Sequence, residues 1–185
     1  IKSVKVVEAF KEVKKESHSE LKADKKLPTI TILHTGGTIA SQVDYRTGAV
    51  VSRFTPEDLL KLIPELKEVA NLRSKLIFKM FSEDMEPEHW AKLAEEVASE
   101  IKQEVDGVII THGTDTIGYT AAALSFALQN LPIPVLIVGA QRSSDRPSSD
   151  AASNLIGAAR FIANSDFAGV GVCMHKNEDD GISLI

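Results

Sequence analysis

The chain has 185 residues, of which 43% are hydrophobic and 25% are charged, and its formal net charge is −5 at pH 7. This length is close to that of one domain, and the composition excludes a disordered tail, a fibrous repeat and a membrane-spanning protein. The single cysteine, Cys173, excludes an internal disulfide and a zinc site of the usual spacing. We therefore expect a globular protein of the cytoplasm that contacts no membrane.

Residues 1–26 differ in charge from the rest of the chain, because they contain eight lysines and five acidic residues. We interpret residues 4–7 as the last strand of a preceding domain and the following charged residues as a linker. Residues 27–185 carry the negative charge and form one domain in this interpretation. Since a nucleic-acid surface needs a basic face, this acidic part does not predict direct binding of nucleic acid.

From residue 27 onward, predicted strands and helices alternate. Residues 29–33 are a β-branched run of strand length. Thr55 and Pro56 are typical of a helix start and precede an apolar run that ends at Ile63. A second helix is indicated after Pro87 by four apolar residues at the spacing of one helix face: Trp90, Leu93, Val97 and Ile101.

The second half of the chain continues the alternation. Strands are predicted at residues 106–110, 134–138 and 169–174, and helices at about 116–129 and 150–164. Near-continuous apolar strands are typical of a parallel sheet that is covered on both faces. The pattern therefore predicts an α/β fold with a doubly wound, mostly parallel sheet.

Two loops that follow predicted strands carry glycines and hydroxyls. Gly37 and Thr38 follow the first strand, and Gly113, Thr114 and Asp115 follow the strand at 106–110. In open parallel sheets ligands bind beyond the carboxyl ends of the strands. A hydroxyl is a weak nucleophile unless a base or proton relay activates it, and a second hydroxyl beside a carboxylate can orient such a relay. The two loops are therefore candidates for a catalytic site.

Each of these residues also has a structural interpretation. Threonine and aspartate after a strand are ordinary helix caps, and glycine is an ordinary turn residue. His34 and His112 have no companion ligands at metal spacing, so we interpret them as hydrogen-bonding loop residues and predict no metal site. Cys173 and Trp90 are most simply core residues. No phosphate-binding loop is present in the sequence.

Two motifs together resemble the paired signature of the asparaginase/glutaminase family. They are TGGTIA at residues 35–40 and THGTDT at residues 111–116, with VGAQR following at residues 138–142. The resemblance covers residues 27–185 and implies the N-terminal domain of an asparaginase-like protein. Within this superfamily, DYRTGAV at residues 44–50 and RFTPEDLL at residues 53–60 are most similar to the D subunits of archaeal glutamyl-tRNA(Gln) amidotransferases. Those subunits carry a small β domain ahead of the asparaginase-like part, to which we assign residues 1–26 with their linker.

The resemblance implies catalytic roles for four residues. Thr38 would attack the side-chain amide of glutamine and form an acyl-enzyme that water hydrolyses. Tyr45 would assist Thr38 and close over the substrate. Thr114 and Asp115 match the second catalytic pair, and Asp115 would also neutralise the α-ammonium group of the substrate.

The resemblance further implies substrate contacts from Gly37, from Ser82 and Glu83, and from the backbone of Ala140. Asparaginases usually have a neutral amide where Glu83 stands, so Ser82 is the stronger candidate for holding the α-carboxylate. The family's catalytic lysine would fall beyond Ile185. The chain begins without methionine and stops inside an apolar run. We therefore expect a fragment that lacks the C-terminal domain and is inactive by itself.

The function implied by the resemblance is that of a glutaminase subunit whose ammonia converts Glu-tRNA(Gln) to Gln-tRNA(Gln). A partner, the E subunit of the amidotransferase, would bind the tRNA and use ATP and Mg²⁺, while this chain would bind no cofactor. The expected assembly is a homodimer of this protein within a heterotetramer. Two alternatives remain open: a free cytoplasmic L-asparaginase that hydrolyses asparagine, and a non-catalytic binding module of the same fold.

Overall fold

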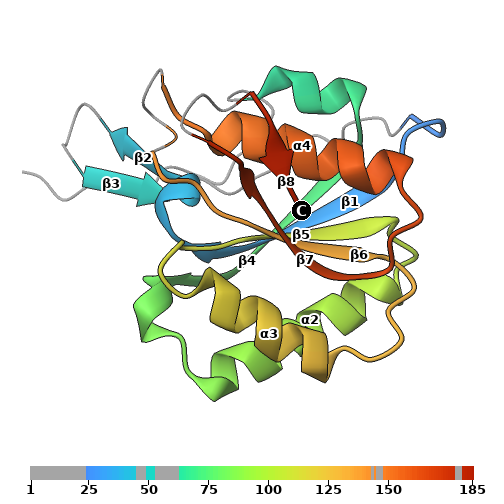
Figure 1. The fold of residues 1–185 in the computed structure, drawn as a ribbon, viewed down its shortest axis with the longest axis horizontal. Helices are drawn as coiled ribbons and strands as arrows, with labels where there is room; N and C mark the ends of the chain where they lie inside the picture. Colours follow the sequence, from blue (N-terminus) through green and yellow to red (C-terminus); the bar gives the residue numbers. More distant parts are fainter. Residues whose placement is uncertain (1–23, 45–48, 53–62, 143, 145–147, 178–180) are drawn as a thin grey trace, which may run out of the picture.

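The structure is a computed structural model that describes residues 24–44, 49–52, 63–142, 144, 148–177 and 181–185. A six-stranded sheet with the order β4-β1-β5-β6-β7-β8 forms its centre (Figure 1). The strands are β1 Thr29–Gly36, β4 Asn71–Met80, β5 Gly107–Thr111, β6 Pro134–Val138, β7 Gly169–His175 and β8 Ser183–Leu184. All neighbouring pairs are parallel except β7 and β8. A separate antiparallel pair consists of β2 Ser41–Asp44 and β3 Ala49–Ser52.

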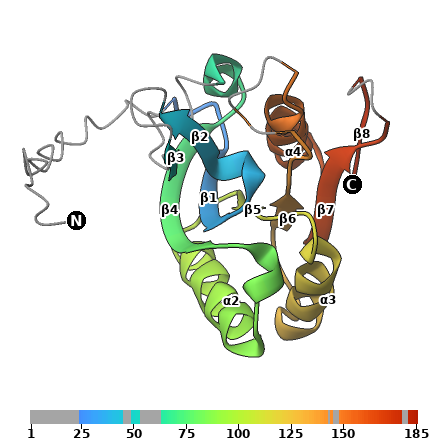
Figure 2. The ribbon, with the colours of Figure 1, turned by 90° about the vertical axis from the view of Figure 1, so that its left-hand side faces the viewer.

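Helices cover both faces of the sheet, as Figures 1 and 2 show. The helices α2 Pro87–Ile101 and α3 Ile117–Ala127 lie on one face, and α4 Ala151–Asn164 lies on the other with the 3₁₀-helix η2 Pro64–Glu68. Alternate strand residues point to opposite faces, so Ile32 belongs to the core under α4 and Leu33 to the core under α2 and α3. The predicted doubly wound, mostly parallel α/β sheet is confirmed.

The predicted elements agree with the structure to within a few residues for four strands and three helices. The long strand β4 was not predicted, because it forms an edge of the sheet and its residues are exposed or half-buried, with three charged side chains: Arg73, Lys75 and Lys79. Trp90 is only half-buried, which corrects its interpretation as a core residue, because its indole N–H donates to Thr120. Cys173 is fully buried, as predicted.

Other predictions fall wholly or partly outside the described part of the chain. Residues 1–23 are not described, so the assignment of residues 1–26 to a preceding β domain and linker stays a prediction. The same holds for the helix predicted to begin at Thr55, of which only the end, at residue 63, is described. None of the helices in the described ranges has the length and apolar character that crossing a membrane requires.

Candidate active site

Four loops meet at the carboxyl edge of the parallel strands, and each carries at least one residue singled out in the sequence. Thr38 begins the short 3₁₀-helix η1 Thr38–Ala40 directly after β1, and Ser82 begins η3 Ser82–Asp84 after β4. The second motif follows β5, and Ala140 follows β6. Because parallel strands end at one edge, residues distant in the sequence are brought together there (Figure 1).

The first and second motifs are in direct backbone contact. Gly37 has a φ of +76°, which residues other than glycine rarely adopt. A Cβ atom added to Gly37 would lie 2.6 Å from the backbone N of Gly113 and 2.8 Å from its Cα. Glycine at position 37 therefore permits the loop that carries Thr38 to touch the loop that carries Thr114.

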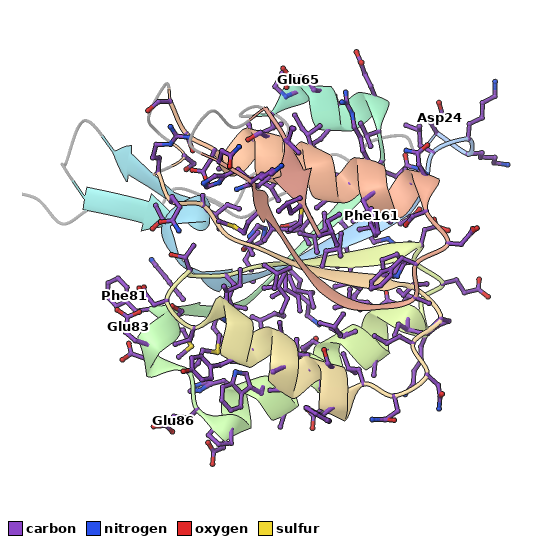
Figure 3. All side chains as sticks on the ribbon, in the orientation of Figure 1. Asp24, Glu65, Phe81, Glu83, Glu86 and Phe161 are labelled. Carbon is purple, nitrogen blue, oxygen red and sulfur yellow. The ribbon has the colours of Figure 1, made fainter. Side chains whose placement is uncertain are left out.

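Ser82 closes one side of this contact. It is buried, and a Cβ atom added to Gly113 would lie 2.7 Å from its Oγ. The hydroxyl of Thr116 donates to the carbonyl oxygen of Ser82 at 2.7 Å, which ties η3 to the second motif. Ser82 Oγ is 3.4 Å from the carboxylate of Glu83, which is exposed and lies on the outside of the molecule in Figure 3.

Thr114 and Ala140 lie on the other side. A Cβ atom added to Gly139 would lie 2.8 Å from Cγ2 of Thr114, so the loops after β5 and β6 are packed together. Ala140 is buried, Thr38 and Thr114 are half-buried, and Asp115 is exposed. Seven of the eight predicted site residues therefore occupy the loops at this edge, while Tyr45 lies outside the described residues.

A buried carboxylate behind the site was missed in the sequence. Asp150 has no solvent exposure, and its two oxygens accept the backbone N–H groups of Gln141 at 3.0 Å and Arg142 at 2.9 Å. Asn154 donates to Asp150 and to the carbonyl oxygen of Gly139, at 3.0 Å each. Side chains at the start of α4 thus hold the loop around Ala140 by hydrogen bonds to its backbone.

The environment of Asp150 favours its charged form. Burial by itself raises the pKa of this carboxyl, but the backbone N–H groups of Gln141, Arg142 and Asp150 itself and the nearby His175 hold the pKa below its usual value. In the sequence, Asp150 marks only the approximate start of a predicted helix, and no motif singles it out. Its side chain makes no capping hydrogen bond to α4.

Both histidines of the motif region are hydrogen-bonded, as predicted. His34 lies 3.0 Å from Thr111 Oγ1 and 3.0 Å from Ser74 Oγ, and burial lowers its pKa to about 3. His112 contacts the carbonyl oxygen of Gly113 at 2.7 Å, and burial lowers its pKa although this carbonyl acts in the opposite direction. Within the described ranges, no three His, Cys, Asp or Glu side chains gather to hold a metal ion.

Comparison with known proteins decides the family. A family model described as the N-terminal part of asparaginase matches residues 29–183. The chain belongs to the asparaginase family. The resemblance of the paired motifs at residues 35–40 and 111–116 to this family is therefore confirmed.

Curated relatives in this family include amidotransferase subunits. The chain is 58% identical over 186 residues to the D subunit of the glutamyl-tRNA(Gln) amidotransferase of Pyrococcus furiosus, and 55% identical over 185 residues to that of Thermococcus kodakarensis. Both matches cover 100% of this chain and 42% of the relative. The chain thus spans less than half the length of these relatives.

Solved structures of the family include asparaginases. The thermostable L-asparaginase from Thermococcus kodakarensis superimposes with a TM-score of 0.70 and 38% identity, covering 78% of this chain and 43% of that one. A probable cytoplasmic L-asparaginase from Campylobacter jejuni gives a TM-score of 0.69 and 35% identity, and the match covers 78% of this chain and 45% of that one. These similarities support the fold that the strand order shows.

Proposed function

We propose that the protein is the glutaminase subunit of a tRNA-dependent amidotransferase. The observation that carries this proposal is the 58% identity to the D subunit of such an amidotransferase along the whole chain. The asparaginase structures share less sequence and match only 78% of the chain. The substrate would be glutamine, and the product ammonia would convert Glu-tRNA(Gln) to Gln-tRNA(Gln).

The chemistry needs a nucleophile and an oxyanion site. Thr38 Oγ1 attacks the amide carbon of glutamine, and the resulting oxyanion is stabilised by backbone N–H groups of the packed loops. Collapse of this intermediate breaks the C–N bond and, with one proton gained, releases ammonia. Water then cleaves the ester on Thr38, which gives glutamate and restores the hydroxyl. The net reaction is glutamine plus water to glutamate plus ammonia.

The other residues of the edge have supporting roles in this proposal. Thr114 relays the proton, Asp115 binds the α-ammonium group, and Ser82 with Gly37 and the backbone of Ala140 binds the rest of the substrate. The contact of Gly37 with Gly113 supports a shared pocket for the two loops. Tyr45 closes over the substrate, and Glu83 lies outside the direct contacts because it is exposed.

The partners are part of the same proposal. The partner, which is the E subunit of the amidotransferase, binds the tRNA and uses ATP and Mg²⁺ to activate the glutamate. Two copies of this protein form a homodimer within a heterotetramer. The acidic body of the chain agrees with tRNA binding by the partner. The assembly is expected in the cytoplasm.

The test uses the full-length protein together with its partner, tRNA and ATP. Thr38→Ala is expected to abolish formation of Gln-tRNA(Gln) from glutamine, whereas added ammonium chloride restores it, because only the ammonia source is lost. Thr29→Ala, at the opposite end of the same strand, is the matched control and is expected to retain activity. Unchanged turnover of Thr38→Ala would contradict a threonine nucleophile and favour a non-catalytic module.

A free L-asparaginase is the second candidate, and the TM-score of 0.70 to such an enzyme favours it. The same preparation separates the two functions. Hydrolysis of asparagine by the protein alone, unaffected by partner, tRNA or ATP, would support the asparaginase. Glutamine hydrolysis that rises when partner and Glu-tRNA(Gln) are added would support the amidotransferase.

A further inference from the structure

A chain of hydrogen bonds runs from helix α2 through α3 to the second motif. The indole N–H of Trp90 donates to Thr120 Oγ1 at 3.0 Å, Thr120 Oγ1 lies 2.9 Å from His112 Nε2, and His112 Nδ1 lies 2.7 Å from the carbonyl oxygen of Gly113. Thr120 and His112 are completely buried. The chain therefore ends at the carbonyl oxygen of Gly113, inside the second motif.

The direction of each bond in this chain follows from its two ends and from the neutral state of the buried His112 ring. An indole N–H can only donate, and a carbonyl oxygen can only accept. Thr120 therefore accepts from Trp90, and Nδ1 of His112 carries a hydrogen that it donates to Gly113. Because a neutral ring has one N–H, Nε2 of His112 then accepts the hydroxyl hydrogen of Thr120.

The residue whose carbonyl oxygen contacts His112 is closely packed. A Cβ atom added to Gly37 would lie 2.6 Å from Gly113 N, and one added to Gly113 would lie 2.7 Å from Ser82 Oγ. A peptide unit is planar, so its carbonyl oxygen and the next N–H point in opposite directions. A fixed carbonyl oxygen on Gly113 therefore also fixes the direction of the Thr114 N–H and the start of the Thr114 backbone.

We propose that His112 is a positioning residue, which Thr120 and Trp90 hold in one tautomer so that it sets the orientation of the Gly113–Thr114 peptide beside Thr38. This inference rests on the proposed function, because the peptide is oriented for the attack of Thr38 on the substrate. It goes further in assigning a role to a histidine outside the predicted catalytic and binding residues. It also connects the site to α2 and α3, whose side chains do not touch the substrate in the mechanism above.

The test removes single hydrogen bonds in the full-length protein and measures kcat and KM for both glutamine and asparagine. Thr120→Val removes the hydroxyl but retains the shape of the threonine side chain. We expect kcat to fall about 10- to 100-fold, because misplacing a group at the reacting centre costs this order of rate, while KM changes less than about threefold. Thr120→Ser restores the hydroxyl and is expected to restore kcat to within about threefold of wild type.

Trp90→Phe is a milder variant for the case in which Thr120→Val does not fold. It removes the five-membered ring with its N–H but keeps an aromatic side chain, after which the Thr120 hydroxyl is no longer tied to the indole, so we expect a fall in kcat of about 3- to 10-fold. Ser125→Ala is the matched control, because this hydroxyl on α3 donates only to the backbone of Ala121. It is expected to leave kcat unchanged.

The outcomes separate this inference from the proposed function. Wild-type kcat in both Thr120→Val and Trp90→Phe, with or without a lower melting temperature, would overturn the positioning role. A loss of kcat that Thr120→Ser does not rescue would also overturn it. A wild-type protein that hydrolyses only asparagine would overturn the glutaminase proposal, while the same variants, assayed with asparagine, would still decide the role of His112.

Discussion

The Nδ1 atom of His175, at the end of β7, lies 2.9 Å from Oδ2 of Asp150, a carboxylate that is fully buried at the start of α4. The same carboxylate accepts the backbone N–H groups of Gln141 and Arg142. One side chain thus connects the end of β7, the start of α4 and the loop after β6. Because that loop carries Ala140, the stability of the fold and the shape of the proposed site depend on the same group.

Asp150→Asn is expected to lower the free energy of unfolding by about 2 to 4 kcal/mol, because an amide cannot accept two backbone N–H groups with both of its terminal atoms. Urea unfolding at pH 7 measures the change. Asp166→Asn, at an exposed site after α4, is the control and is expected to change stability by less than about 0.5 kcal/mol. Equal effects of the two substitutions would contradict the assigned role.

The buried His34 predicts a pH dependence of stability. The pKa of His34 is lowered from its ordinary value of 6.5 to about 3 in the folded chain. At pH values between 3 and 6.5, the unfolded chain therefore binds more protons than the folded chain. The contribution of His34 is therefore complete above pH 6.5 and is lost as the pH falls toward 3. Between pH 7 and pH 5 this loss amounts to about 2 kcal/mol.

Urea unfolding at the two pH values checks this prediction. His34→Gln is expected to lose about 2 kcal/mol less than wild type over this interval, because glutamine does not titrate. His89→Gln, at a half-buried histidine of α2, is the control for the general effect of removing a histidine. An unchanged pH dependence in His34→Gln would show that His34 is not the group responsible.

Gly37→Ala is expected to damage both stability and activity. The added Cβ would meet the backbone of Gly113, and the positive φ disfavours alanine, so in the full-length protein we expect stability to fall by at least about 2 kcal/mol and the proposed release of ammonia to be mostly lost. The melting temperature and the glutamine assay measure the two effects.

Gly118→Ala is the matched control for Gly37→Ala. Gly118 lies within helix α3, and nothing lies within 4 Å of a Cβ added there. Alanine is a better helix former, so a gain of about 0.5 to 1 kcal/mol with unchanged activity is expected. A destabilised Gly118→Ala would show that the surroundings of α3 are more crowded than the structure indicates.

Cys173 is expected to be unreactive in the folded chain. Burial raises the pKa of its thiol to about 11 from an ordinary 9.0, which leaves about 100-fold less thiolate near neutral pH, and the side chain has no solvent exposure. Iodoacetamide at pH 8 should therefore label the chain only after urea unfolds it. Rapid labelling without urea would contradict this packing, and Cys173→Ala identifies the labelled site.

The sequence predicted the parts of the fold that have an all-apolar or strictly periodic pattern. The residues of β5 and β6 are buried on both faces and, apart from Thr111, apolar, so their composition alone indicates parallel strands. The edge strand β4 has one neighbour and a mixed pattern, in which Lys75 pairs with Glu96 of α2 in place of core packing. Such an edge strand forms because it pairs with β1, and this pairing cannot be predicted from the residues of β4 alone.

In the candidate site, too, some residues could be predicted from the sequence and others could not. Thr38, Thr114 and Asp115 were found because motifs of adjacent residues carry them. His112 was correctly interpreted as hydrogen-bonded, but its partner Thr120 lies eight residues away on α3, and Trp90, which donates to Thr120, lies on α2. Asp150 was not singled out, because its partners, Gln141, Arg142 and His175, meet it only after folding.

The sequence by itself therefore determined the class of fold, the family and the residues that carry reactive groups, since these depend on composition and on residues close together in the chain. Tertiary structure alone decided that Gly37 touches Gly113, that Ser82 closes this contact and that His112 and Asp150 hold the loops around it. The physical reason is that these contacts join ends of different strands. Their distances depend on the packing of the whole sheet against the helices on both of its faces.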